Sequence, residues 1–164
     1  MGYDALVAAK TNRDKERGKG TPFTYMKNLL TSLLFYKFSN VGVKIDESND
    51  ELNFKTFSLS VGICKYNGGG MMQLPNAIPD DGLLDMTLIK KLSRFNVIKS
   101  LKKLFDGTLT EHPKVVTFKG STIHIESEPK IFIEADGESI GHSPAKFEII
   151  PKSLRVVVGK TKDP

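Results

Sequence analysis

Residues 68–86 read GGGMMQLPNAIPDDGLLDM, and a second short motif, EADGE, follows at residues 134–138. The first run opens with three glycines, which permit positive φ angles and let the backbone pass close to a neighbouring group. Each motif also contains an Asp-Gly pair, Asp81-Gly82 in the first and Asp136-Gly137 in the second. An isolated Asp-Gly pair predicts a tight turn between two strands and nothing more. The order and separation of the two motifs are therefore more informative than either pair alone.

Together these motifs resemble the diacylglycerol kinase catalytic family, to which sphingoid-base kinases and bacterial lipid kinases also belong. The first run is similar to that family's GGGM, P-x-A and DG-x-LD signature, and Asp136-Gly137-Glu138 is similar to its DGE turn. Gly2-Tyr3-Asp4-Ala5 also resembles the segment that opens the family's C-terminal domain, so the resemblance covers nearly the whole chain. It implies the C-terminal β-sandwich domain of a two-domain lipid kinase.

The resemblance also implies a second domain that these residues do not contain. In the family, an N-terminal α/β domain carries a GGDGT loop that binds the nucleotide phosphates, and no such loop occurs in residues 1–164. We therefore expect residues 1–164 to form one domain from the C-terminal half of a longer kinase. ATP would bind mainly to the N-terminal domain, and the isolated chain is expected to be inactive.

Composition agrees with one globular domain that has its own core, since 39% of the 164 residues are apolar and 26% are charged. The net charge of +5 suits an anionic membrane, a phosphorylated ligand or a nucleic acid. The absence of an RNA-binding motif or zinc-finger spacing argues against nucleic acid. No apolar run approaches the ~20 residues of a membrane span, and no signal peptide is recognisable. We expect a cytoplasmic protein, with peripheral membrane contact as an additional expectation. Cys64 is expected to be buried and inert.

Two helices are predicted. Thr21 as N-cap and Pro22 begin the first, which runs through Lys37 and should turn an apolar face to the core. That face consists of Phe23, Met26, Leu30, Leu33 and Leu34. Ser93 begins the second helix and Gly107 ends it. Its apolar face lies opposite a basic face, which would either be solvated or rest on anionic lipid headgroups. The basic residues are Arg94, Lys99, Lys102 and Lys103.

The rest of the chain predicts short strands, so the pattern favours a mainly β fold, a β-sandwich with about two helices. Residues 41–45 and 52–54 alternate as a hairpin, after which the apolar positions change from even to odd numbers, and we expect a β-bulge there. A weak strand is predicted over residues 1–9, followed by a polar loop over residues 10–20. Further strands are predicted at residues 84–88, 114–118, 122–126, 130–134, 145–150 and 154–158.

The resemblance assigns Glu138 to the family's general-base position, where it would orient a lipid hydroxyl and accept its proton late in the transfer of the ATP γ-phosphate. Asp136 is the second catalytic candidate. It would orient Glu138 or lie near a magnesium ion, although an Asp at this position also stabilises a turn. Gly68, Gly69 and Gly70 are expected to line the cleft between the two domains.

The resemblance implies a structural cation at the first Asp-Gly pair. In bacterial members of the family, Mg²⁺ or Ca²⁺ is held by the Asp and by flanking backbone carbonyls, which correspond here to Asp81, Ile78 and Leu83. Hard divalent cations prefer such oxygen ligands. An ordinary Asp-Gly turn without a cation explains the same residues.

The implied function is therefore that of a transferase, an ATP- and magnesium-dependent lipid kinase of phospholipid metabolism. Diacylglycerol or a sphingoid or related lipid alcohol would be the acceptor. Two alternatives remain open at this point. One is a non-catalytic β-sandwich that binds a lipid or an anion, and the other is a domain of an NAD-kinase-like enzyme.

Overall fold

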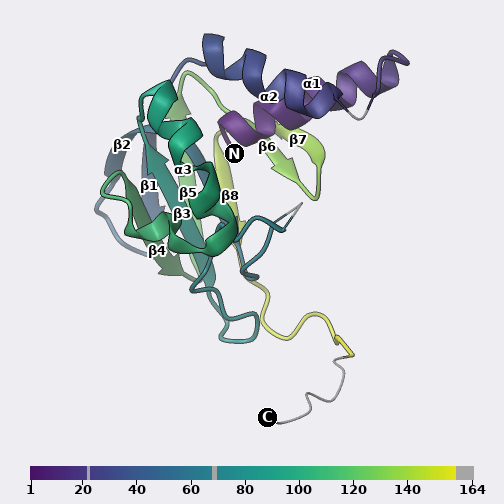
Figure 1. The fold of residues 1–164 in the computed structure, drawn as a ribbon. Helices are drawn as coiled ribbons and strands as arrows, with labels where there is room; N and C mark the ends of the chain where they lie inside the picture. Colours follow the sequence, from purple (N-terminus) through teal and green to yellow (C-terminus); the bar gives the residue numbers. More distant parts are fainter. Residues whose placement is uncertain (22, 68–69, 158–164) are drawn as a thin grey trace.

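The computed structural model describes residues 1–21, 23–67 and 70–157. Within them, eight strands form two antiparallel sheets, which confirms the mainly β architecture (Figure 1). Six strands form the large sheet, in the order β4-β3-β2-β1-β5-β8, and β6 pairs with β7 in a small sheet. The strands are β1 (Ser39–Ile45), β2 (Leu52–Gly62), β3 (Leu84–Lys90), β4 (Val115–Gly120), β5 (Thr122–Glu128), β6 (Phe132–Ala135), β7 (Glu138–His142) and β8 (Ala145–Glu148).

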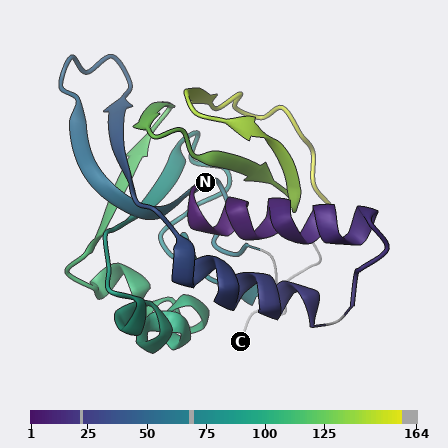
Figure 2. The same ribbon diagram turned by 90° about the horizontal axis from the view of Figure 1, so that it is seen from above.

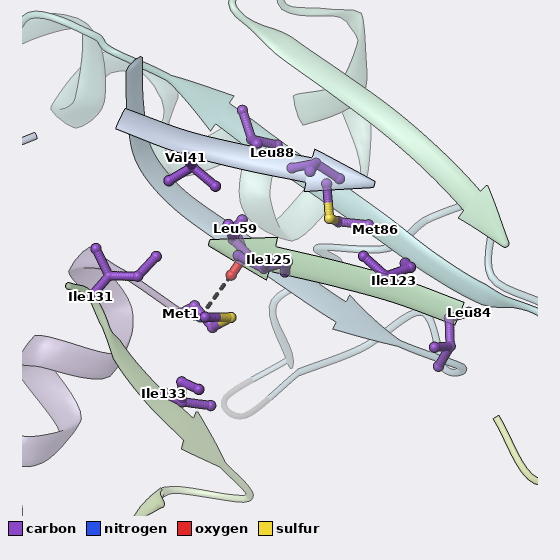
Figure 3. Close-up of a cluster of buried hydrophobic side chains, with 11 residues drawn as sticks. Met1, Val41, Leu59, Leu84, Met86, Leu88, Ile123, Ile125, Ile131 and Ile133 are labelled. Carbon is purple, nitrogen blue, oxygen red and sulfur yellow. Dashed lines mark hydrogen bonds between the residues drawn. The ribbon is translucent and has the colours of Figure 1, made fainter. Parts of the chain in front are cut away.

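The main core lies between the large sheet and the segment that leads into the small one (Figure 3). Apolar side chains alternate along β1, β3 and β5 and so reach the same face of the large sheet, as period-two patterning requires. Ile131 and Ile133 close this core from the side of β6. The buried side chains are Met1, Val41, Val43, Leu59, Leu84, Met86, Leu88, Ile123, Ile125, Ile131 and Ile133.

The predicted hairpin and its bulge are both confirmed. β1 pairs antiparallel with β2, and the pairing of β2 with β3 then shifts between Thr56 and Ser58. Because Thr56 pairs with Lys90 and Ser58 with the adjacent Ile89, β2 carries one extra residue. The bulge lets an even-numbered residue before it, Phe54, and an odd-numbered residue after it, Leu59, pack in the same core.

The chain begins with a helix that the sequence analysis missed. Helix α1 (Tyr3–Glu16) replaces the strand predicted over residues 1–9 and most of the polar loop predicted over residues 10–20. These predictions are wrong because residues 5–16 are mostly good helix formers, whereas their apolar pattern is weak. The pattern is weak because α1 packs on two sides, against α2 and against the β6–β7 hairpin (Figure 2). The described residues thus contain three α-helices rather than two.

Helix α2 (Thr24–Phe35) is where predicted, but its orientation is the reverse of the prediction. It begins at Thr24, so Thr21 is not its N-cap, and Pro22 lies outside the described residues. Its buried side chains are Thr24, Asn28, Ser32 and Leu33. Of the five apolar residues predicted to face the core, only Leu33 is buried, whereas Phe23, Met26, Leu30 and Leu34 are exposed. The polar face of α2 packs on α1, where Lys10 Nζ donates to Ser32 Oγ over 3.0 Å.

Helix α3 (Arg94–Asp106) has the predicted caps. Ser93 Oγ accepts a hydrogen bond from the Asn96 amide over 3.2 Å, and Gly107 ends the helix with a φ of 76°. A short 3-10 helix, η2 (Thr108–Glu111), follows. No strand forms at residues 154–157, contrary to prediction, and Val158 lies outside the described residues. In the described part of the chain, no helix is both long and apolar enough to cross a membrane.

Candidate functional site

The Asp136-Gly137 pair forms the turn between β6 and β7. Asp136 has a φ of 50° and Gly137 a φ of 85°, two positive angles that are typical of a two-residue type I′ hairpin. The carboxylate of Glu134 accepts a hydrogen bond from the Gly137 amide over 2.6 Å. On the other side, Asn12 of α1 donates its side-chain amide to the Gly137 carbonyl over 2.7 Å. The turn is therefore fixed both within the hairpin and against α1.

A cavity of about 440 Å³ lies beside this hairpin. The end of β2 and the segment after it line one side, through residues 60–67, with Gln73 and Leu74. The hairpin lines the other side, through residues 133–136 and Ile140. Two sequence motifs that are about sixty residues apart thus meet at one hollow.

Hydrogen bonds join a third motif to the same place. Gln73, from the glycine-rich run, accepts from the Asn67 side chain over 3.1 Å and donates to Asp4 over 3.4 Å. The Ser58 hydroxyl also donates to Asp4, over 2.9 Å. Asp4 belongs to the Gly2–Ala5 motif, which the sequence analysis used only for the resemblance. The sequence alone predicts no role for Asp4 or Gln73, and the only signal for them is that each lies inside one of the motifs.

Of the predicted catalytic pair, Asp136 lines the cavity and Glu138 does not. Glu138 begins β7, where it pairs with Ala135 across the turn, and its side chain is exposed. The hairpin therefore holds the Glu138 backbone in place and leaves its carboxylate at the protein surface, two residues from the cavity.

The predicted cleft glycines are only partly described. Gly68 and Gly69 lie outside the described residues, and Gly70 is exposed with a φ of 79°. Asn67 and Gln73, which flank this run, both line the cavity. Glycine at position 70 is required by its left-handed backbone, because a side chain there would be strained.

The first Asp-Gly turn carries an ion pair that the sequence did not reveal. Asp81 accepts a hydrogen bond from the Leu83 amide over 2.9 Å, and its second oxygen lies 2.9 Å from Lys119 Nζ. Lys119 Nζ also lies 3.3 Å from the buried Oδ2 of Asp85, and this ion pair is the polar contact of that oxygen. The hydrogen bond from Lys119, with that from Leu83, lowers the pKa of Asp81. Asp81 is therefore a carboxylate at neutral pH.

This turn offers oxygen atoms of the kind that Mg²⁺ or Ca²⁺ prefers. The Ile78 carbonyl faces the turn, where it accepts from the Asp81 amide over 3.3 Å, and Asp81 and the buried Asp85 oxygen contribute negative charge. Among the described residues, no group of three or more His, Cys, Asp or Glu side chains is placed to hold a metal. A cation here would depend on backbone carbonyls and would compete with the Lys119 ammonium for Asp81.

Magnesium is expected to raise the melting temperature of the chain if Asp81 holds it in the folded state only, because such binding stabilises by mass action. Asp81→Asn should largely abolish this rise, and Lys119→Met should increase it by removing the competing ammonium. Thermal melts with and without saturating Mg²⁺ measure both effects. Asp50→Asn, at an exposed residue of the loop between β1 and β2, is the matched control. An equal magnesium response in wild type and Asp81→Asn would place any cation elsewhere.

Cys64 is exposed and lines the cavity, so the prediction that it is buried is wrong. The apolar run around it suggested burial, but β2 ends at Gly62 and the chain then leaves the sheet.

Comparison with known proteins finds one matching family model, described as the YegS C-terminal NAD kinase beta sandwich-like domain, over residues 1–158. A protein named diacylglycerol kinase from Mycobacterium tuberculosis is 31% identical over 157 residues, which cover 95% of this chain and 49% of that protein. A protein named "Probable lipid kinase YegS-like" from Shewanella frigidimarina is 33% identical over 159 residues, covering 96% of this chain and 50% of that protein. The chain thus spans about half the length of these relatives.

A solved structure shows the same fold. The crystal structure of a diacylglycerol kinase from Bacillus anthracis superposes with a TM-score of 0.55 and 26% sequence identity. The superposition covers 74% of this chain and 43% of that protein.

Proposed function

The chain belongs to the YegS C-terminal domain family, and from this membership we propose that it is the acceptor-side domain of an ATP-dependent lipid kinase. The acceptor would be diacylglycerol or a sphingoid or related lipid alcohol. The observation that carries the proposal is the meeting of three motifs at one cavity. The DGE hairpin and the glycine-rich run line it, and Asp4 is hydrogen-bonded to Gln73 in its wall.

Glu138 is proposed as the general base. A carboxylate is too weak to ionise an alcohol beforehand, so it would orient the lipid hydroxyl in line with the γ-phosphate and accept the proton late, as the P–O bond forms. The fixed turn supports this role, because Asn12 and Glu134 hold the Gly137 backbone immediately before Glu138. Asp136, on the cavity side of the turn, would orient the acceptor or Glu138.

ATP is proposed to bind mainly to an N-terminal nucleotide-binding domain that faces this cavity, with Gly68, Gly69 and Gly70 lining the cleft between the two domains. A structural Mg²⁺ or Ca²⁺ is proposed at Ile78, Asp81 and Leu83, where it would fix the turn that leads into β3. The enzyme would work in the cytoplasm, where its lipid substrate requires peripheral contact with a membrane. The similarity to a diacylglycerol kinase and to a YegS-like lipid kinase favours a lipid acceptor over an NAD-kinase-like activity.

The purified 164-residue chain is expected neither to hydrolyse ATP nor to phosphorylate diacylglycerol at a measurable rate. Phosphoryl transfer depends on a cradle for the β- and γ-phosphates, and this chain has no GGDGT or other phosphate loop. Radiolabelled ATP with diacylglycerol in mixed micelles measures the activity. A polypeptide in which the proposed GGDGT domain precedes this chain is the positive control.

Robust phosphorylation by the chain alone would refute the two-domain assignment. If the complete polypeptide were folded, bound lipid and phosphorylated none of the candidate acceptors, the chain would instead be a non-catalytic lipid-binding module.

A further inference from the structure

Helix α2 turns its apolar side chains away from the protein. Phe23, Met26, Leu30 and Leu34 recur at helical spacing, and all four are exposed, Leu30 by 51%. The opposite face, which packs on α1, is polar: Asn28 donates to Thr11 over 3.3 Å and to Asp14 over 3.0 Å. An apolar stripe of this length in contact with water is unfavourable and marks a surface that binds something else.

Helix α3 has a second exposed stripe of the same kind. Phe95, Ile98, Leu101 and Phe105 recur along one side and are all exposed, Phe95 by 74%. No residue of α3 is buried, although the helix is amphipathic. The two helices touch, because the Arg94 guanidinium donates to the carbonyls of Leu33 and Leu34 at the end of α2. Figure 2 shows both helices on the side of the molecule away from the β6–β7 hairpin.

The charge of this surface, the α2–α3 face, is almost entirely positive. The two helices carry five basic side chains and one acidic side chain, Asp106 at the end of α3. The basic residues are Lys27, Arg94, Lys99, Lys102 and Lys103. Long basic side chains beside exposed aromatic and aliphatic residues are typical of helices that lie at the surface of an anionic bilayer.

We propose that the α2–α3 face docks on an anionic lipid bilayer, with the apolar stripes at the acyl boundary and the lysine side chains among the phosphate headgroups. A second copy of the chain fits this face poorly. A twofold interface would pack the same patch of both copies together, with five basic residues on each side, and each chain carries a net charge of +5.

The α2–α3 face is joined to the cavity by a short stretch of chain. The Met72 amide donates to the Leu104 carbonyl of α3 over 2.6 Å, while the next residue, Gln73, lines the cavity. Helix α3 is therefore hydrogen-bonded to the segment that forms one wall of the cavity, while the β6–β7 hairpin lines the other side. The inference that docking serves the cavity rests on the proposed function. The docking itself requires no kinase activity.

Flotation of the 164-residue chain with lipid vesicles tests the proposal directly. We expect binding to phosphatidylcholine vesicles that contain phosphatidylglycerol and little binding to phosphatidylcholine alone. Raising the salt from about 0.1 M to about 1 M should release the chain, because the Debye length falls from about 10 Å to about 3 Å. Failure of the folded wild-type chain to prefer the anionic vesicles would overturn the proposal without any variant.

Two pairs of substitutions locate the surface. Lys99→Gln with Lys102→Gln should weaken binding roughly 25-fold, since each basic residue near an anionic surface contributes roughly 5-fold. Leu30→Ser with Ile98→Ser should weaken it on the order of 10-fold through lost apolar burial. The matched controls change exposed residues outside both helices: Lys130→Gln with Arg155→Gln, and Ile150→Ser with Leu154→Ser. These controls should change binding by less than about twofold.

Equal losses in the surface pairs and their controls would overturn the assignment to α2 and α3. So would a wild-type dimer in sedimentation analysis that Leu30→Ser with Ile98→Ser converts to a monomer, because a second copy would then cover the face. Loss of vesicle binding when a GGDGT domain precedes the chain would also overturn it, since that domain would cover the face. The assay contains neither ATP nor an acceptor lipid, so an inactive Glu138→Gln enzyme that still floats would leave the docking intact.

Discussion

Glu138→Gln is expected to lower the turnover number of the complete kinase by ~10²–10⁴, the usual contribution of a general base. Glutamine keeps the size and hydrogen-bonding capacity of the side chain and removes only its charge and basicity. The Asp136-Gly137 turn should survive, because its hydrogen bonds involve Asn12 and Glu134 rather than Glu138. Steady-state kinetics with a saturating lipid alcohol and ATP measure the change, and the two Michaelis constants should change little.

Two isosteric changes serve as controls for Glu138→Gln. Glu126→Gln alters an exposed carboxylate on β5 and should leave turnover unchanged. Glu134 lies in the cavity wall, and Glu134→Gln keeps an oxygen that can accept from the Gly137 amide. This variant therefore tests whether turnover depends on the geometry of the turn alone. Normal turnover in a folded Glu138→Gln enzyme would remove the catalytic assignment and leave Glu138 as a residue of the hairpin.

Period-two patterning and turn chemistry predicted most of the β-structure. The hairpin of β1 and β2 followed from the alternation of Val41, Val43 and Ile45, and the bulge followed from the change of apolar positions after Thr56. Both are local rules that do not depend on distant partners. Helix α1 could not be found in this way, because it contacts α2 on one side and β6–β7 on the other, and no single apolar stripe records both contacts.

Within the candidate site, only the turns inside the sequence motifs could be predicted, and the contacts between distant residues could not. The turn at Asp136 could be predicted because an Asp-Gly pair favours a hairpin turn through its own backbone preferences. The link between Asp4 and Gln73, which are sixty-nine residues apart, depends on the packing of α1 beside β2, and local sequence contains no record of that packing. The same holds for Lys119, which reaches Asp81 and Asp85 from β4.

The predicted orientation of α2 is wrong for a different reason. Helical periodicity identifies two faces of a helix, and the prediction assumed that the apolar face is the one that packs on the protein. In this chain the polar face packs, because Thr11, Asp14 and Lys10 of α1 provide partners for Asn28 and Ser32. Polar groups can be buried when they are hydrogen-bonded in this way. The exposed stripe then becomes available for the bilayer.

Stability measurements should show this reversal directly, because Ser32 and Leu30 exchange the roles that the apolar pattern predicts. Ser32 is fully buried against α1, so Ser32→Leu should lower the free energy of unfolding by about 1–3 kcal/mol through overpacking. Leu30 is half exposed, so Leu30→Ser should change it by less than about 0.5 kcal/mol. Urea unfolding of the chain without lipid measures both, and Thr31→Leu, an exposed polar-to-apolar change in the same helix, is the control for Ser32→Leu.

If Leu30 were a core residue, Leu30→Ser would be the more destabilising change and Ser32→Leu would be tolerated. That ranking would place the polar face of α2 in solvent and remove the apolar surface on which the membrane proposal depends.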